Sequence, residues 1–206
     1  MIIQRLEVGP LMANCYILGC ETTKTAALID PGGDADKLLM ALAEASLEVK
    51  YLINTHGHFD HVGGNSRMKD VTGAKIACHP DDEPMLLELS RSAARYGLSA
   101  EDSPPADIFL KDGDDITFGD ITLKVIATPG HSLGGICLYT PGHLFAGDTL
   151  FMGSIGRTDL PGGDYDTLIA SIKNKLLVLP EDTVVYPGHG PETSIGYEKR
   201  MNPFLN

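Results

Sequence analysis

The segment Thr55–His61, with the sequence T-H-G-H-F-D-H, constrains the fold more than any other part of the chain. It contains four potential metal ligands within six positions: His56, His58, Asp60 and His61. The apolar run Tyr51–Ile53 directly before it predicts a strand over residues 49–53, so we expect the ligands where that strand ends. Imidazoles two positions apart point the same way only if the backbone is extended. Because imidazoles and carboxylates are the usual ligands of catalytic Zn, Fe and Mn, the segment predicts a metal site.

Three further candidate ligands occur in the second half of the chain, each directly after a glycine: His131, Asp148 and His189. A glycine lets the backbone turn sharply at the end of a strand and bring the next side chain into a cleft. Seven candidate ligands are too many for one tetrahedral zinc ion. They suit two divalent ions about 3.5–4 Å apart that share one carboxylate and one bridging water.

Short strands and helices follow one another in two series that divide near residue 100. In the first series we expect strands over 2–8, 14–19, 25–30, 49–53 and 74–77, and helices over 34–45, 61–69 and 80–96. In the second we expect strands over 108–110, 116–118, 121–127, 136–139, 144–146 and 183–186, a helix over 164–177 and a short helix before Pro203. Two such halves facing each other predict two packed sheets flanked by helices. No linker separates them, which favours a single domain over residues 1–206.

Composition excludes several functional classes. The net charge of −12 argues against binding nucleic acid, whose phosphates would repel the protein. No apolar run approaches the ~20 residues that a membrane-spanning helix needs. The N-terminal residues 1–7 lack the basic and then apolar pattern of a signal peptide, so we expect a cytoplasmic protein. The four cysteines show no C-x-x-C spacing, which favours free, buried thiols over structural zinc.

The combined motifs H-x-H-x-D-H, G-H, G-D and G-H-G resemble the metallo-β-lactamase superfamily. The flanking segments Ala146–Phe151 and Pro187–Gly190 are most similar to its glyoxalase II branch, the hydroxyacylglutathione hydrolases. The resemblance covers residues 14–204 and implies an αββα sandwich, an α/β fold with two mixed sheets flanked by helices and the metals at the edge between them. Typical motifs of that branch carry a histidine where this chain has Gly57. Full-length members also continue into a C-terminal helical domain, whereas this sequence stops at Asn206.

The resemblance also implies a role for each candidate ligand. One ion would be held by His56, His58 and His131. The other would be held by Asp60, His61 and His189. Asp148 would bridge the two ions, and Asp30 would orient ligands from behind them.

We therefore expect a metal-dependent hydrolase with two divalent ions, Zn first and Fe or Mn as alternatives. A metal-bridging hydroxide would attack a small-molecule thioester such as S-(2-hydroxyacyl)glutathione, with Asp60 and Asp148 as the catalytic residues. A thiol has a pKa of about 8.5, so its thiolate can depart without a dedicated general acid. An amide would need proton donation. This difference, the absent export signal and the Asp60–His61 pair disfavour a classical β-lactamase.

Other functions remain open. Persulfide dioxygenases resemble the same branch and use one iron, for which His56, His131 and Asp148 match. Hydrolysis of another small ester or lactone, or a non-catalytic binding role, is also compatible with the ligand set. The run Gly130–Gly134 satisfies G-x-S-x-G, the nucleophile elbow of serine hydrolases. That elbow needs a helix after the serine, however, and residues 135–143 read as a strand and a turn.

Two residues near Asp148 are candidates for substrate binding. Arg157 could contact an anionic substrate or pair with a neighbouring aspartate, and Phe151 could line the pocket. We interpret the run Asp81-Asp82-Glu83 as the acidic first turn of a helix. The sequence does not indicate an oligomeric state.

Overall fold

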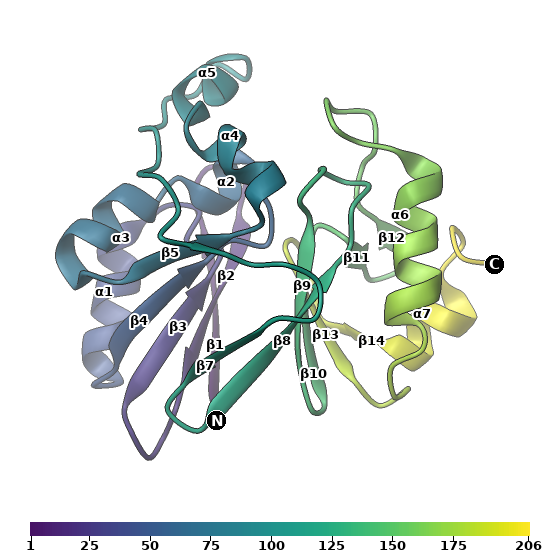
Figure 1. Cartoon of the computed structure of the whole chain (residues 1–206), viewed down its shortest axis with the longest axis horizontal. Coiled ribbons are helices and arrows are strands. Elements are labelled where there is room, and N and C mark those ends of the chain that lie inside the picture. Colours follow the sequence, from purple (N-terminus) through teal and green to yellow (C-terminus); the bar gives the residue numbers. More distant parts are fainter.

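Two six-stranded β-sheets pack face to face in the computed structural model, which describes residues 1–206, and helices cover the outer face of each sheet (Figure 1). This arrangement confirms the expected αββα sandwich. None of the helices has the length and apolar character needed to span a membrane.

The first sheet is mixed and contains the strands of the N-terminal half. Its strands, in spatial order, are β1 (Ile2–Val8), β2 (Ala13–Gly19), β3 (Thr25–Ile29), β4 (Glu48–Ile53), β5 (Lys75–Cys78) and β6 (Ile108–Phe109). The first three strands are antiparallel, and β3 to β6 run parallel. Every residue of β2 is buried, because one face of this strand meets the other sheet and the opposite face meets helices.

The second sheet is also mixed. In spatial order its strands are β14 (Thr193–Ser194), β13 (Val184–Pro187), β10 (His143–Gly147), β9 (Ile136–Thr140), β8 (Ile121–Ala127) and β7 (Asp115–Phe118). Only β10 and β13 pair in parallel. A separate hairpin is formed by β11 (Leu150–Phe151) and β12 (Ser154–Ile155).

The helices occupy three places in the sandwich. The outer face of the first sheet carries α1 (Ala35–Glu44) and α3 (Asn65–Thr72), and that of the second carries α6 (Tyr165–Ser171) and α7 (Ile195–Met201) (Figure 1). The short helices α2 (Phe59–Val62), α4 (Glu83–Leu86) and α5 (Leu89–Ala94) lie at one end of the first sheet (Figure 1). That end is also where β4 delivers the Thr55–His61 segment.

Three apolar layers hold the sandwich together, one between the sheets and one beneath each outer set of helices. The layer between the sheets contains 17 buried residues from both halves of the chain. At its centre the Phe145 and Tyr186 rings stack with centroids 4.8 Å apart, and Tyr16 meets Phe145 edge-on at 5.4 Å. Aromatic pairs of this kind add about 0.5–1.5 kcal/mol beyond the area they bury. They fix the spacing of the sheets directly beneath the loops that carry the candidate ligands.

The boundary between the strands of the two sheets was predicted near residue 100, which is one strand too early. Ile108 and Phe109 were expected in the second series, but β6 pairs in parallel with β5 and forms the edge of the first sheet. The Asp107 carboxylate holds the start of β6 beside β5 by accepting hydrogen bonds from Ile76 N (2.8 Å) and from Lys69 Nζ (2.7 Å). Long-range contacts of this kind leave no periodic pattern in a sequence.

Three predicted helices are interrupted. The helix expected over 80–96 is a 3₁₀ turn over 80–82 followed by α4 and α5, and the one over 61–69 is divided between α2 and α3. The one over 164–177 continues from α6 as a π-helical turn, Ile172–Leu176. The Asp164 side chain caps α6 by accepting a hydrogen bond from Thr167 N, but the Asp34 side chain makes no such bond at the start of α1. Its carboxylate accepts a hydrogen bond from Gly9 N instead (3.0 Å).

Candidate metal centre

All seven candidate ligands converge at one end of the sandwich, in the gap between the two sheets. Four of them lie on the loop after β4 and on α2, while the others follow β8, β10 and β13: His131, Asp148 and His189. The strands β8, β10 and β13 run in the same direction, so their C-terminal ends meet at one edge. The sequence reasoning that placed each ligand at the end of a strand therefore explains why they meet.

The first cluster is formed by His56, His58 and His131, whose ligand atoms all lie within 4.8 Å of one another. The Nε2 atom of His131 is 2.9 Å from the Nδ1 atom of His58. The Nε2 atom of His56 is buried and has no hydrogen-bond partner. Two nitrogens bound to one tetrahedral zinc ion lie roughly 3.3 Å apart, given Zn–N bonds of about 2.0–2.1 Å. The three imidazoles are therefore spaced as ligands of a common ion.

The second cluster is formed by Asp60, His61 and His189. The Nε2 atoms of the two histidines are 3.1 Å apart. The Oδ2 atom of Asp60 lies 3.2 Å from His189 Nε2 and 3.5 Å from His61 Nε2. One carboxylate oxygen and two ring nitrogens thus face a common point beside the first cluster.

Asp148 lies between the two clusters. Its Oδ1 atom is 3.4 Å from His61 Nε2, and its Oδ2 atom is 3.6 Å from His131 Nε2. Oδ1 is buried without a hydrogen-bond donor, which matches a position facing a cation. The orphaned atoms of His56 and Asp148 and the nitrogen and oxygen donor set together fit two divalent metal ions.

The ring nitrogens that face away from the clusters have their own partners. Asp30, which is buried, places its Oδ2 atom 3.1 Å from His61 Nδ1. The backbone carbonyl of Arg157 lies 2.8 Å from His131 Nδ1 and can accept a hydrogen bond from it. When the imidazole is neutral, as it must be to bind a metal, a hydrogen bond donated by Nδ1 fixes the tautomer that leaves Nε2 as the ligand atom.

The electrostatics of the two clusters differ. Burial, followed by the charge of His131, lowers the pKa of His58 to about 4, and burial also lowers the pKa of His56. Both are therefore neutral near pH 7, the form that binds metals. Burial alone would lower the pKa of His61, but the nearby carboxylates of Asp148 and Asp60 raise it to about 10. These carboxylates make the second cluster a place that favours positive charge, which a divalent cation supplies.

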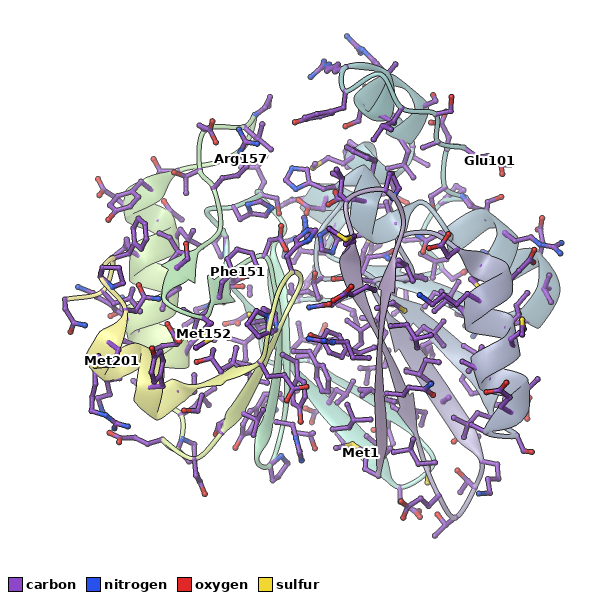
Figure 2. The ribbon with its side chains drawn as sticks, turned by 180° about the vertical axis from the view of Figure 1, so that it is seen from behind. Met1, Glu101, Phe151, Met152, Arg157 and Met201 are labelled. Atoms are coloured by element: carbon purple, nitrogen blue, oxygen red, sulfur yellow. The ribbon has the colours of Figure 1, made fainter.

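A pocket of about 910 Å³ opens above the clusters, and five of the seven candidate ligands form its floor. Its walls include the side chains of Phe59, Met85 and Phe151, and arginines approach it from α5 and from the loop after β12. Arg157 lies near the upper end of the molecule in Figure 2, and Phe151 lies below it. Both residues predicted to bind substrate thus lie in the pocket wall. Arg157 also pairs with Asp159 through two contacts of 2.8 Å.

The serine-hydrolase interpretation is wrong. Ser132 is fully buried, and its hydroxyl donates to the carboxylate of Asp82 (2.7 Å) rather than facing the pocket. The chain continues into strand β9 and not into the helix that a nucleophile elbow requires.

Sequence reasoning also missed several residues around the site. Asp82 was taken as part of an acidic helix turn but is completely buried. Arg91 and Arg95 on α5 line the pocket, although nothing in their spacing relates them to the ligands. Asn14 donates hydrogen bonds to two carbonyl groups in the turn that carries His189, at 2.9 Å each. In the sequence, the only sign of this last contact was a polar residue, Asn14, at the start of an otherwise apolar strand.

Comparisons with known proteins agree with the geometry. The sequence profile of the metallo-beta-lactamase superfamily matches residues 8–189. A Haemophilus influenzae protein named hydroxyacylglutathione hydrolase GloC is 40% identical over 223 aligned positions, which cover 100% of this chain and 99% of that protein. The crystal structure of the BLEG-1 B3 metallo-beta-lactamase superposes with a TM-score of 0.93 at 40% identity and covers both chains fully.

A second solved structure bears on the metal content. TTHA1623, solved in a di-iron-bound form, superposes with a TM-score of 0.91 at 40% identity, over 98% of this chain and 100% of that one. The profile match, the full-length relatives and the clustered histidines and aspartates support one conclusion, which the sequence motifs predicted. The chain belongs to the metallo-beta-lactamase superfamily and has the fold and metal-binding groups of its hydrolases.

Proposed function

We propose that this protein hydrolyses a thioester of the S-(2-hydroxyacyl)glutathione type at a pair of divalent metal ions, zinc in the first place. The observation that carries the proposal is the convergence of seven candidate metal ligands at one point, five of them on the floor of a substrate-sized pocket. Pockets of about 300–1,000 Å³ are typical of sites for small molecules. The relative named hydroxyacylglutathione hydrolase GloC supports the choice of substrate.

In this proposal the first ion is held by His56, His58 and His131, and the second by Asp60, His61 and His189. Asp148 would contribute to both sites, since its carboxylate lies within 3.8 Å of His131 in the first cluster and of His61 and His189 in the second. When bound, two such ions supply a water acidic enough to act as a nucleophile near pH 7, and they polarise the carbonyl of the substrate.

The carboxylates of Asp60 and Asp148 are the catalytic groups that the chain itself contributes. Both line the floor of the pocket, where they can accept hydrogen bonds from the attacking water and hold its orientation. Although burial on its own would raise the pKa of Asp60, the neighbouring His61 and His189 hold it below its ordinary value. Asp60 is therefore an ionised acceptor across the neutral range.

The pocket lining favours a leaving group that needs no proton. Apart from the proposed metal ligands, the only carboxylate or imidazole in the lining is Glu88, which pairs with Arg91 (3.2 Å). An amide nitrogen must be protonated as it departs, whereas a thiolate with a conjugate-acid pKa of about 8.5 departs unaided. The site is therefore better matched to a thioester than to an amide.

Positive charge at the pocket entrance favours an anionic substrate. Three arginines line the pocket of a protein whose net charge is −12: Arg91, Arg95 and Arg157. Guanidinium groups bind carboxylates through paired hydrogen bonds. A thioester whose thiol carrier bears carboxylates, as glutathione does, would match this charge pattern.

Two other reactions must be separated from the proposed one. β-Lactam hydrolysis is favoured by the name of the BLEG-1 structure, which is as similar in sequence as the GloC relative. Persulfide oxidation at a single iron would need only His56, His131 and Asp148, and Asp148 Oδ2 lies 3.6 Å from His131 Nε2. Both would use residues already at the site, so their activities are measured beside thioester hydrolysis.

The test is to measure metal content together with three activities: thioester hydrolysis, hydrolysis of a chromogenic β-lactam, and oxygen uptake with glutathione persulfide. We expect close to two metal ions per chain and chelator-sensitive thioester hydrolysis that exceeds the other activities by at least tenfold. One iron per chain with oxygen consumption, or preferential β-lactam cleavage, would refute the proposal. His58→Ala should abolish turnover, and His143→Gln, at the opposite end of β10 from Asp148, serves as the matched histidine control.

A further inference from the structure

The carboxylate of Asp82 is buried at the start of α4 and has no cationic partner. It accepts three hydrogen bonds from two separate loops. Its Oδ2 atom accepts from Gly57 N (2.9 Å) and from the hydroxyl of Ser132 (2.7 Å), and its Oδ1 atom accepts from Gly134 N (2.6 Å). A buried carboxylate is costly unless its oxygens are satisfied, and these three donors satisfy both of them.

The donors to Asp82 are adjacent in sequence to one particular set of ligands. Gly57 lies between His56 and His58, and Ser132 directly follows His131. Every ligand of the first cluster is therefore one residue away from a group that is hydrogen-bonded to Asp82. No residue of the second cluster has such a neighbour.

Both loops approach Asp82 too closely for a side chain to fit. A Cβ atom on Gly57 would lie 2.8 Å from the backbone oxygen of Asp82 and 2.7 Å from the Cβ atom of Met85. A Cβ atom on Gly134 would lie 2.8 Å from the backbone nitrogen of Asp82. This packing explains why the chain has Gly57 where the glyoxalase II motif carries a histidine. The residue is small because the loop is pressed against the start of α4.

The second cluster has its own buried carboxylate, which makes the comparison informative. Asp30 contacts the Nδ1 atom of His61 and accepts from Thr55 N, next to the ligand loop. Asp82 does not touch an imidazole, and it acts on the backbone that carries the imidazoles. Asp30 also reaches the first cluster through Thr55, which directly precedes His56 and places its hydroxyl 3.1 Å from His56 Nδ1, whereas Asp82 supports the first cluster alone.

We propose that Asp82 is a positioning residue that ties the His56–His58 loop to the loop after His131 and so shapes one of the two metal sites. The inference rests on the proposed binuclear centre, because it assumes that the first cluster binds an ion. It predicts that a loss of Asp82 acts selectively on that ion and leaves the other in place. A residue with only a structural role would weaken both sites together.

The test uses Asp82→Asn, which keeps the shape of the side chain but replaces one oxygen with an amide group. One of the backbone N–H donors then faces another donor, so at least one loop loses its contact. Metal binding is measured by calorimetry and by visible absorption with Co²⁺, on full-length protein whose folding is checked by circular dichroism. We expect one of the two binding events to weaken by about 10–100-fold and the other by less than threefold.

Two matched variants complete the design. Asp30→Asn should weaken the second-cluster event, because Asp30 contacts His61, and it can also affect the first through Thr55, so only Asp82→Asn should spare the second cluster. Asp81→Asn changes the neighbouring exposed carboxylate, which makes no contact with either ligand loop, and should leave both events unchanged. If Asp82→Asn does not fold, Ser132→Ala removes one of the three hydrogen bonds and keeps both backbone contacts. It should weaken, by about 3–10-fold, the binding event that the Co²⁺ spectrum assigns to the first cluster.

The outcomes separate this inference from the proposed function. Failure of the wild-type protein to bind two ions would refute the binuclear centre itself. Two ions in the wild type, with both binding events unchanged in folded Asp82→Asn, would refute the positioning role alone. Equal weakening of both events would also overturn it, since that result indicates a general loss of structure. For Ser132→Ala, unchanged binding of both ions is the refuting result.

Discussion

Replacing Asp30 by alanine should destabilise the metal-free protein strongly. Asp30 is 1% exposed and accepts hydrogen bonds from Thr55 N (2.7 Å) and Thr55 Oγ1 (2.6 Å), besides its contact with His61. Leaving the buried Thr55 N–H without an acceptor costs about 1–3 kcal/mol, and the hydroxyl contact adds about 1 kcal/mol. Asp30 also has a φ of 53°, and a left-handed conformation costs alanine roughly 1–2 kcal/mol. The expected loss is therefore about 3–6 kcal/mol, a large part of the total stability of an ordinary domain.

The assay is urea unfolding in the presence of a chelator, so that metal binding does not contribute to the measured stability. With a slope of at most about 3 kcal/mol/M, the midpoint should fall by at least about 1 M. Asp34→Ala is the matched control, because Asp34 has a similar φ of 47° but accepts only one exposed hydrogen bond, from Gly9 N. The φ cost and the single hydrogen bond together give a loss of about 1.5–3.5 kcal/mol, roughly half that expected for Asp30→Ala.

Asp30→Asn separates stability from metal binding. Asparagine tolerates a left-handed backbone and keeps an oxygen for Thr55 N, so the stability should fall by less than about 2 kcal/mol. Its amide group would donate to His61 Nδ1 and move the ring proton to Nε2, the nitrogen that faces Asp60 and Asp148. Metal affinity at the second cluster should then fall by about 10–100-fold. A midpoint shift below about 0.3 M for Asp30→Ala, or unchanged metal binding by Asp30→Asn, would refute the reasoning.

Gly57→Ala should lower stability by about 1–3 kcal/mol, seen as a lower thermal midpoint, because the new Cβ atom would lie 2.7 Å from that of Met85. An unchanged midpoint would show that the loop has room. Arg157→Ala should raise the KM for an anionic thioester about fivefold with little change in kcat, and Asp159→Ala, which frees the guanidinium, is its control. An unchanged KM would remove Arg157 from substrate binding. Asn14→Ala should cost about 1–3 kcal/mol in urea unfolding, since two carbonyl groups lose their donor, and equal midpoints would contradict this. Removing the metal with a chelator should abolish hydrolysis, and added Zn²⁺ should restore it, whereas turnover that persists without metal would contradict a metal-dependent reaction.

The candidate ligands could be predicted because their chemistry restricts both residue type and spacing. The dense H-x-H-x-D-H run stands out by itself, whereas the pairs ending in His131, Asp148 and His189 resemble other Gly-Asp and Gly-His pairs in the chain and were distinguished by the family resemblance. The alternation of strands and helices also predicted the layers of the sandwich, since each apolar stripe needs a partner to cover it. The boundaries near residues 80–96 and 108–110 could not be predicted in the same way, because packing against other segments decides them.

Asp82 shows where sequence reasoning stops. In the run Asp81-Asp82-Glu83, three acidic residues precede an apolar stretch, which is the usual pattern of a solvent-exposed first helical turn. The carboxylate is buried because loops about 25 and 50 residues away in the sequence lie against it. No local pattern encodes such a contact. The glycines at 57 and 134 were the only local traces of it, and each has other common explanations.

The position of the centre between the sheets also ties metal binding to folding. Each cluster takes two ligands from the first half of the chain and one from the second, namely His131 or His189. An ion in either cluster therefore connects the two sheets, and it can bind fully only after they have packed against each other. Because only the folded state offers the complete site, metal binding adds to its stability. The gain is about 4 kcal/mol at a free ion concentration 1,000 times the Kd. Beneath the loops, the Tyr16 ring of the first sheet packs edge-on against Phe145 and Tyr186 of the second, which sets the distance that the ions would bridge. The sandwich thus determines the geometry of the metal centre, and the metal ions in turn stabilise the contact between its two sheets.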